Sequence, residues 1–360
     1  MVQAATDPSL RAILGKAESG RRIDESEALL LLRSHDLPAL GRAAHAVRMR
    51  LHPEPVVTYI VDRNINYSNV CAASCDFCAF YRRKGEEGAY VLNHAEMRAK
   101  ITELLAAGGI QILLQGGLHP DLRLDWYEEM LRWIKLNFPV HIHGFSPPEI
   151  VFFAKLNKMT LAEVIRRLRA AGLGSIPGGG AEILSDRLRP VMAKGKCTAD
   201  EWIECMREAH RQGLRSSATM MFGHVETLEE RVDHLRRVRD LQDESGGFTA
   251  FIPWTLQPAL RMADVPPAGS FEYLKQLAVS RIYLDNVPNF QSSWVTQGAD
   301  VGSLALFFGA NDMGSTMLEE NVVKAAGAAF RMSEFEIRER IERSGFVPRA
   351  RDNSYALLAT

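Results

Sequence analysis

Residues 56–83 read VVTYIVDRNINYSNVCAASCDFCAFYRR, an apolar and β-branched run that leads directly into three clustered cysteines. Valine, isoleucine, threonine and tyrosine favour extended backbone, so we predict a strand that ends shortly before Cys71. Asp62, Asn64 and Asn66 alternate along this strand and are expected to share one of its faces. The spacing C-x₃-C-x₂-C then brings three thiols into one loop, which indicates a metal-binding loop at the end of a strand.

Strand-like runs alternate with amphipathic helical segments from this point to residue 314. Eight such strands are predicted, and strict alternation implies that they are parallel with helical crossovers. Eight units in a chain of this length favour a closed (β/α)₈ barrel of the TIM type, an α/β fold, over an open sheet in two domains. We expect an N-terminal helical segment over residues 1–52, the barrel over 53–335, and a C-terminal helix and tail over 336–360.

Composition excludes several classes of protein. The chain has 360 residues, of which 46% are hydrophobic, and its formal net charge is −1, so the basic excess of a nucleic-acid-binding protein is missing. No apolar run approaches the roughly 20 residues of a membrane span. The first residues lack the apolar core of a signal peptide, and tight clustering of an odd number of cysteines does not suit a secreted disulfide framework. These features predict a cytoplasmic enzyme with no membrane or nucleic-acid partner.

The three clustered cysteines are one ligand short of a closed structural zinc site, which uses four protein ligands. Cys197 and Cys205 fall in a distant helical unit, and we interpret them as buried bystanders. Three thiols from one loop instead suit a 4Fe–4S cluster with one iron left open to a small chelating molecule. A non-radical iron–sulfur electron carrier is the alternative of another class, although such carriers normally supply four cysteines for each cluster.

A C-x₃-C-x₂-C loop after the first strand of a β/α barrel resembles the radical S-adenosylmethionine (SAM) superfamily. This resemblance implies that Cys71, Cys75 and Cys78 ligate three irons, and that the amino and carboxylate groups of SAM chelate the fourth. In that superfamily the second strand usually ends in Gly-Gly-Glu, where this chain has Gln115-Gly116-Gly117. The resemblance assigns seven residues to SAM: Phe77, Phe80, Gln115, Gly116, Gly117, Ser146 and Glu182. Ser146 and Glu182 are equally compatible with the substrate.

The blocks SPPEI (146–150), GGGAEIL (178–184) and FIPWTLQP (251–258) are more specific. Together with the cysteine loop they resemble the cyclic dehypoxanthine futalosine synthases, radical SAM enzymes of menaquinone biosynthesis. Aminofutalosine synthase and the deazaflavin chromophore synthase share part of the pattern and remain alternatives. The resemblance implies abstraction of the ribose C4′ hydrogen of dehypoxanthine futalosine by a 5′-deoxyadenosyl radical, addition to the benzoate ring, and a low-potential electron donor such as flavodoxin or ferredoxin.

Such a substrate needs polar groups for its sugar, donors for its carboxylate and aromatic walls. The candidates at predicted strand ends are Arg63, Asn64, Asn66, His143, Trp254, Gln257, Asn289, Gln291 and Asn311, each of which could equally fill the core of the barrel. Restoring the aromatic ring also requires a base near neutral pKa. His119 is the favoured catalytic base because histidine titrates near neutrality, and Glu182 and Glu226 are the alternatives. His119 could instead cap a turn before Pro120.

Overall fold

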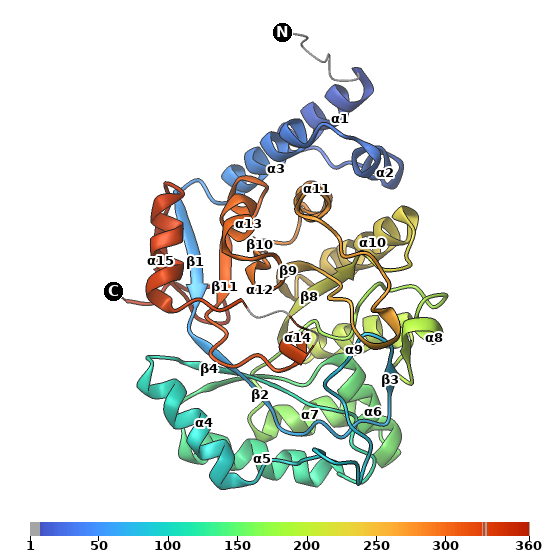
Figure 1. Cartoon of the computed structure of the whole chain (residues 1–360), viewed down its shortest axis with the longest axis vertical. Helices are drawn as coiled ribbons and strands as arrows, with labels where there is room; N and C mark the ends of the chain where they lie inside the picture. Colours follow the sequence, from blue (N-terminus) through green and yellow to red (C-terminus); the bar gives the residue numbers. More distant parts are fainter. Residues whose placement is uncertain (1–7, 326, 328–329, 360) are drawn as a thin grey trace.

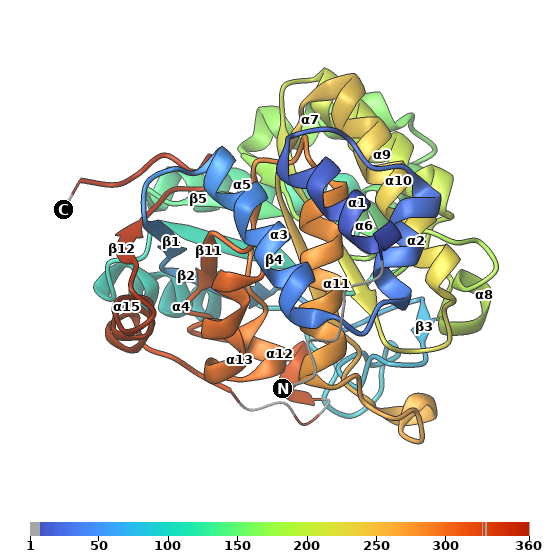
Figure 2. The ribbon, with the colours of Figure 1, turned by 90° about the horizontal axis from the view of Figure 1, so that it is seen from above.

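The computed structural model describes residues 8–325, 327 and 330–359. Three helices come first: α1 (Pro8–Glu18), α2 (Glu25–Arg33) and α3 (Leu37–Leu51). Asp24 caps α2 and Asp36 caps α3, since each side chain accepts a hydrogen bond from a backbone N–H in the first turn. Figure 1 shows these helices together at one end of the molecule, and α3 packs against the later helix α11 (Ser270–Tyr283), as Figure 2 also shows.

Seven parallel strands form one curved sheet in the order β10-β9-β8-β6-β5-β4-β2. Their bounds are β2 (Asp62–Asn66), β4 (Gln111–Gln115), β5 (His141–Gly144), β6 (Ser175–Ile176), β8 (Arg215–Phe222), β9 (Phe248–Thr255) and β10 (Asn289–Phe290). Because all seven run in the same direction, their carboxyl ends meet at one rim.

A second sheet, in the order β11-β1-β12, completes the barrel. It contains β1 (Val56–Ile60), β11 (Asp312–Ser315) and β12 (Val347–Ala350), with both neighbours parallel to β1. Only Val61 separates β1 from β2, and a bridge between Gln291 and Asp312 joins the two sheets at the other edge. The eight predicted strands are therefore all present and parallel, which confirms the predicted barrel. Strand β12 was not predicted.

Helices lie between successive strands and cover the barrel. Threonine, serine or asparagine begins several of them in a capping box, as Thr160 does with Glu163. The larger helices are α4 (His94–Ala106), α5 (Leu124–Asn137), α6 (Pro147–Asn157), α7 (Leu161–Ala171), α9 (Ala199–Arg211), α10 (Leu228–Ser245) and α15 (Glu334–Arg343). The shorter ones are α8 (Arg189–Met192), η1 (Leu260–Met262), α12 (Trp294–Gln297), α13 (Ala299–Leu304), η2 (Ala305–Phe307) and α14 (Val322–Ala325).

Two very short strands fix the cysteine loop. β3 (Ser74–Cys75) pairs antiparallel with β7 (Ala193–Lys194), which follows α8. The backbone N–H of Asp76 also donates to the carbonyl of Met192 at 2.9 Å. The loop is thereby attached to the β6–α9 connection on the far side of the rim, an arrangement that sequence patterning did not predict. None of the helices in the described ranges is long and apolar enough to cross a membrane.

Candidate active site

A cavity of about 410 Å³ occupies the interior of the barrel and reaches the rim at the carboxyl ends of the strands. Most of the residues that the sequence assigned to a site line it. They are Cys71, Cys75, Cys78, Phe77, Phe80, Gln115, Gly116, Gly117, Ser146, Glu182, Asn64, Asn66, His143, Trp254 and Gln291. The structure therefore brings the proposed cluster, SAM and substrate positions into one space.

The three cysteines of the loop are free thiols, with Cys75 buried and Cys71 and Cys78 half-buried. Burial raises the pKa of Cys75 to about 12, and it also raises the pKa of Cys71. Without iron the thiols of Cys71 and Cys75 are therefore neutral, so these two must release their protons when they bind a cluster. Cys197 and Cys205 are buried away from the cavity, in agreement with their interpretation as bystanders.

The donor set suits a cluster better than a single ion. Among the described residues no three His, Cys, Asp or Glu side chains converge on one metal position. In a 4Fe–4S cluster each thiolate binds a different iron, so three separated thiols around one space are the arrangement that a cluster requires. The three thiols that line this one space match in number the protein ligands of a 4Fe–4S cluster with one open iron.

The two glycines of Gln115-Gly116-Gly117 permit close backbone contact with the cysteine loop. A Cβ on Gly117 would collide with the carbonyl oxygen of Val70 and lie 2.9 Å from Cβ of Cys71. Gly117 does not have a left-handed backbone angle, so the lack of a side chain, and not an unusual conformation, explains a glycine at this position. Its function is to leave room between strand β4 and the loop.

Glu149 joins the end of β4 to the start of α6. It belongs to the block SPPEI, but it was not predicted as a site residue. Its carboxylate accepts hydrogen bonds from the Tyr67 hydroxyl at 2.7 Å and from the Gly116 N–H at 3.0 Å. It also accepts from the N–H and hydroxyl of Ser146, at 2.7 and 2.6 Å, as part of the cap of α6. Burial raises the pKa of Glu149. The Ser-x-x-Glu spacing predicts the cap, but nothing in the sequence predicts the bond to Gly116.

Glu182 and Lys196 form a buried ion pair beside the cysteines, with Nζ 2.7 Å from Oε1. Lys196 also lies over the ring of Phe77, at 5.3 Å from its centroid. Burial alone would lower the pKa of Lys196, but Cys75 and Glu182 hold it above its usual value. Oε2 of Glu182 makes no hydrogen bond within the described ranges. Lys196 lines the cavity but has no distinctive sequence signal.

The middle of the barrel is lined by polar side chains of β2 and β4. Asp62, Asn64 and Asn66 are all buried and all line the cavity, which confirms that they share a face. Gln111 donates to Asp62 at 3.1 Å, and the Ser315 hydroxyl also bonds Asp62. Oδ1 of Asn64 has no hydrogen-bond partner among the described residues and is available to a ligand.

Six predicted residues do not line the cavity. Arg63 points outward, where it pairs with Glu103 at 2.5 Å and Glu319 at 2.8 Å. Asn311 donates to Asn289 at 2.9 Å within the core. The side-chain amide of Gln257 bonds locally, to the Thr255 carbonyl and hydroxyl at 3.2 Å. These four side chains are held by bonds within the protein: Asn289 and Asn311 bond each other, Arg63 bonds residues distant in sequence, and Gln257 bonds its own neighbour.

The two remaining residues are His119 and Glu226, both candidates for the base. Nδ1 of His119 accepts from the N–H of Asp121 at 3.2 Å, which is the turn cap considered as its alternative, and burial lowers the pKa of His119. Glu226 is bonded to His224 and Arg231. Burial alone would raise the pKa of Glu226, but these partners lower it to about 2. Neither side chain reaches the cavity.

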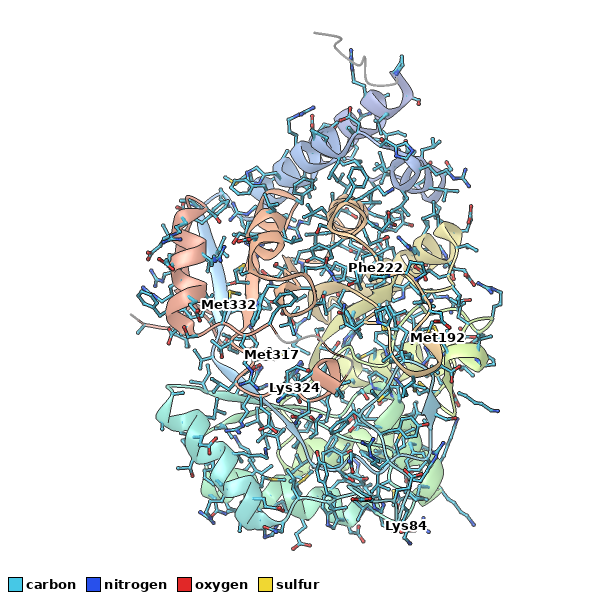
Figure 3. The ribbon with its side chains drawn as sticks, viewed as in Figure 1. Lys84, Met192, Phe222, Met317, Lys324 and Met332 are labelled. Carbon is cyan, nitrogen blue, oxygen red and sulfur yellow. The ribbon has the colours of Figure 1, made fainter. Side chains whose placement is uncertain are left out.

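Two C-terminal segments also line the cavity and were not predicted. Arg351, Asn353 and Tyr355 follow β12 into the barrel, where Arg351 pairs with Asp312 at 2.6 Å. Met317, Glu320 and Val322 approach from the segment that leads into α14. Figure 3 shows Met317 and Lys324 near the middle of the view, where Figure 1 places α14, and Lys84 at the edge of the molecule.

Comparisons with known families agree with this geometry. Residues 65–238 match the radical SAM superfamily, and residues 245–360 match the CofH/MqnC C-terminal region. The cyclic dehypoxanthine futalosine synthase of Halalkalibacterium halodurans is 44% identical over 98% of this chain and 96% of its own. That of Streptomyces coelicolor is 45% identical over 96% and 88%. The aminodeoxyfutalosine synthase of Thermus thermophilus is 38% identical over 97% and 96%.

Solved structures share the fold at low sequence identity. A methylornithine synthase matches with a TM-score of 0.73 and 20% identity, over 93% of this chain and 97% of its own. The FeFe-hydrogenase maturase HydG from Carboxydothermus hydrogenoformans matches with a TM-score of 0.77 and 18% identity, over 96% and 80%. Since full-length relatives and a three-cysteine rim agree, the chain belongs to the radical SAM superfamily and, within it, to the family of the cyclic dehypoxanthine futalosine synthases.

Proposed function

We propose that this protein cyclises dehypoxanthine futalosine to cyclic dehypoxanthine futalosine, a step of menaquinone biosynthesis, by radical SAM chemistry. The observation that carries the proposal is one cavity that joins three free thiols at the rim to a polar layer inside the barrel. A chain with this cavity and relatives of that name at 44 and 45% identity has both the site and the ancestry for the reaction.

Cys71, Cys75 and Cys78 would hold three irons of a 4Fe–4S cluster. When bound, the cluster would supply the single electron that splits SAM into methionine and a 5′-deoxyadenosyl radical. A low-potential ferredoxin or flavodoxin is the proposed source of that electron. The attachment of the loop to β7 and to Met192 keeps the three thiols on one side of the cavity.

SAM would lie across the rim, between the cysteine loop and the ends of β4 and β6. The narrow contact at Gly117 leaves the backbone of β4 accessible to the methionine part. Lys196 offers a cation to the SAM carboxylate, and the unbonded Oε2 of Glu182 offers an acceptor to an amino or hydroxyl group. Phe77 and Phe80 provide apolar surface for the adenosine, with Gln115, Gly116 and Ser146 beside it.

The substrate would occupy the interior of the barrel below SAM. Asn64, Asn66 and Gln291 present amide groups to the sugar, and Trp254 forms an apolar wall for the benzoate ring. His143 faces the same space from β5. Outside the cavity lie Arg63, Gln257, Asn289 and Asn311, which would act only by holding the surrounding structure in place.

The proposal is tested with anaerobically reconstituted protein, SAM, dehypoxanthine futalosine and a low-potential reductant. We expect the cyclic product and free 5′-deoxyadenosine in equal amounts. An aminofutalosine synthase would instead convert a carboxyvinyloxy-benzoate into a product that contains the deoxyadenosyl group. A cluster whose spectrum does not change when SAM is added would indicate an electron carrier and would refute the proposal.

A further inference from the structure

Two histidines and one serine form a hydrogen-bonded chain that leads out of the cavity. Nδ1 of His143 lies 2.7 Å from the hydroxyl oxygen of Ser175, and Nε2 of His141 lies 2.7 Å from the same oxygen. Ser175 is 1% exposed, while both histidines are partly exposed, His143 to the cavity. The hydroxyl is therefore a buried link between a ring in the cavity and a second ring below it.

Strand geometry explains this alignment. His141 and His143 are two residues apart on β5, so their side chains project from the same face. His143 pairs in register with Ser175 of β6, which places the serine beside it in the barrel. In the same layer, Leu113 of β4 pairs with both His143 and Asn64. Asn64 and His143 therefore lie in one layer of the barrel, and both line the cavity.

The shared hydroxyl sets the direction of the hydrogen bonds. A hydroxyl has one proton, so it donates to one ring nitrogen and accepts from the other. Nδ1 is the ring nitrogen of His143 that bonds Ser175, and His143 lines the cavity, so Nε2 is the nitrogen left for the substrate. If Nδ1 of His143 donates to Ser175, then Ser175 donates to Nε2 of His141, and Nε2 of His143 keeps a free lone pair toward the substrate.

Burial keeps the rings of His141 and His143 neutral. Burial, together with His141 and Arg351, lowers the pKa of His143 to about 3. Burial also lowers the pKa of His141, with Lys135 adding to the shift and Asp352 opposing it. The pKa of His143 is lower than the near-neutral value expected of the base, but the cyclohexadienyl cation left by electron loss is strongly acidic, so a weakly basic neutral ring accepts its proton and does not retain it. His143 is consequently suited to pass a proton onward rather than to store it.

We propose that His143 is the catalytic base that removes the proton from the benzoate ring, and that Ser175 and His141 relay this proton to solvent at the lower end of the barrel. The inference rests on the cyclase function proposed above. His119 and Glu226, the candidates from sequence, lie outside the cavity, and Glu182 is already paired with Lys196 beside the cysteines.

Addition of the C4′ radical to the ring leaves a delocalised radical. The attacked ring carbon is now tetrahedral and carries both its hydrogen and the new bond to C4′. The unpaired electron passes to a one-electron acceptor of the ferredoxin or flavodoxin class, and the C–H bond breaks with its electron pair returning to the ring. The proton goes to Nε2 of His143, while the Nδ1 proton moves to Ser175 and the Ser175 proton moves to His141.

The first test measures cyclic product per 5′-deoxyadenosine in His143→Gln, Ser175→Ala and the wild type. We expect deoxyadenosine to form in all three, while the product ratio falls by about 100-fold in His143→Gln, the low end of the contribution of a positioned base. A smaller loss is expected in Ser175→Ala. Ser216→Ala is the matched control, because Ser216 is equally buried and bonds a histidine, His210, at 2.7 Å outside the cavity.

The second test needs no cluster. Nitrogen-15 NMR of histidine-labelled, cluster-free protein should show His143 protonated at Nδ1 only, and Ser175→Ala should alter the signals of both His141 and His143. Ser216→Ala should alter His210 alone. Protonation of His143 at Nε2, or an unchanged product ratio in His143→Gln, would overturn the relay. A wild type that makes no cyclic product, with the predicted NMR pattern intact, would refute the cyclase function and leave the hydrogen-bond direction standing.

Discussion

Glu182 and Glu226 follow the neighbouring strands β6 and β8, and each is buried beside a basic side chain. We call the surroundings of Glu226 the closed corner. There Glu226 accepts from the N–H groups of Gly223 and His224, at 2.7 and 2.9 Å, and from Arg231 at 2.8 Å. In the open corner, the surroundings of Glu182, its carboxylate accepts a hydrogen bond only from Lys196, and its second oxygen lies 3.9 Å from Nη1 of Arg189 without a hydrogen bond within the described ranges.

The two carboxylates differ in how many hydrogen bonds they accept, and this difference distinguishes a structural glutamate from a candidate ligand-binding one. A buried carboxylate that is fully bonded stabilises the fold, whereas one with an unbonded oxygen carries a desolvation cost that a ligand can relieve. Only the open corner borders the cavity and the cysteines. Sequence position gave both glutamates the same candidate role, because each follows a strand. The number of bonds that each carboxylate makes distinguishes them.

The largest expected effect lies in the open corner, at the cysteines. Alanine at Cys71, Cys75 or Cys78 should abolish iron binding, because the other two cysteines of the chain are buried outside the cavity. Iron content and the visible spectrum after anaerobic reconstitution measure this. Cys197→Ala and Cys205→Ala are the controls and should retain full iron. Loss of iron in either control would contradict the assignment of three ligands.

The next effect concerns the contact between β4 and the cysteine loop. In Gly117→Val the new side chain meets the Val70 carbonyl and Cys71, so both iron retention and SAM affinity should fall while the cluster-free protein still folds. Gly269→Val is a suitable control, since its Cβ would meet nothing within 4 Å and its φ is −76°. Equal SAM binding by the two variants, measured by the spectral change on titration, would show that the contact is irrelevant to SAM.

Much of the fold could be predicted because each barrel strand is a continuous run with a local pattern. The predicted order of eight parallel strands needed only alternation along the chain. Strands β3 and β7 have two residues each, too few for any periodicity. β12 contains Pro348 and Arg349 and has no strand-like pattern of its own. It forms because it pairs with β1, and this pairing depends on the tertiary structure.

The site divides in the same way. Residues that belong to one strand end or one loop, such as the cysteines and Gly117, were predicted because the motif contains them. Lys196 follows β7 and pairs with Glu182 of the same β6–α9 connection, 14 residues earlier, a separation that no helix or strand periodicity marks. Asn289 and Asn311 resemble ligand residues in the sequence, yet they bond each other across neighbouring strands. Pairings of that kind depend on packing and not on the residues alone.

A direct comparison of the corners uses the same substitution in each. Glu226→Gln breaks a buried ion pair with Arg231 and should lower the free energy of unfolding by about 3 kcal/mol. Glu182→Gln should cost less stability but weaken SAM binding about tenfold, the effect of one hydrogen bond to a charged group. Urea unfolding of the cluster-free proteins and SAM titration of the reconstituted ones provide the two measurements. Reversed effects would show that Glu226, and not Glu182, serves the ligand.

The smallest expected effect is the pH dependence of the closed corner. The folded protein holds the pKa of Glu226 at about 2, below its ordinary value of 4.5, through His224 and Arg231 and against the opposing effect of burial. A carboxyl whose pKa is depressed by folding contributes stability above its unfolded pKa, and this contribution is lost as the pH falls through 4.5 toward 2. The stability difference between wild type and Glu226→Gln should therefore be constant from about pH 8 to pH 6 and shrink by about 1 kcal/mol at about pH 4. Urea unfolding of the cluster-free proteins at several pH values measures the difference, and titrating groups that do not contact Glu226 cancel because both proteins share them; His224, which contacts Glu226, is removed from the comparison by making both proteins His224→Gln. A difference that grows on acidification would mean that the folded pKa is raised and that the corner is not closed.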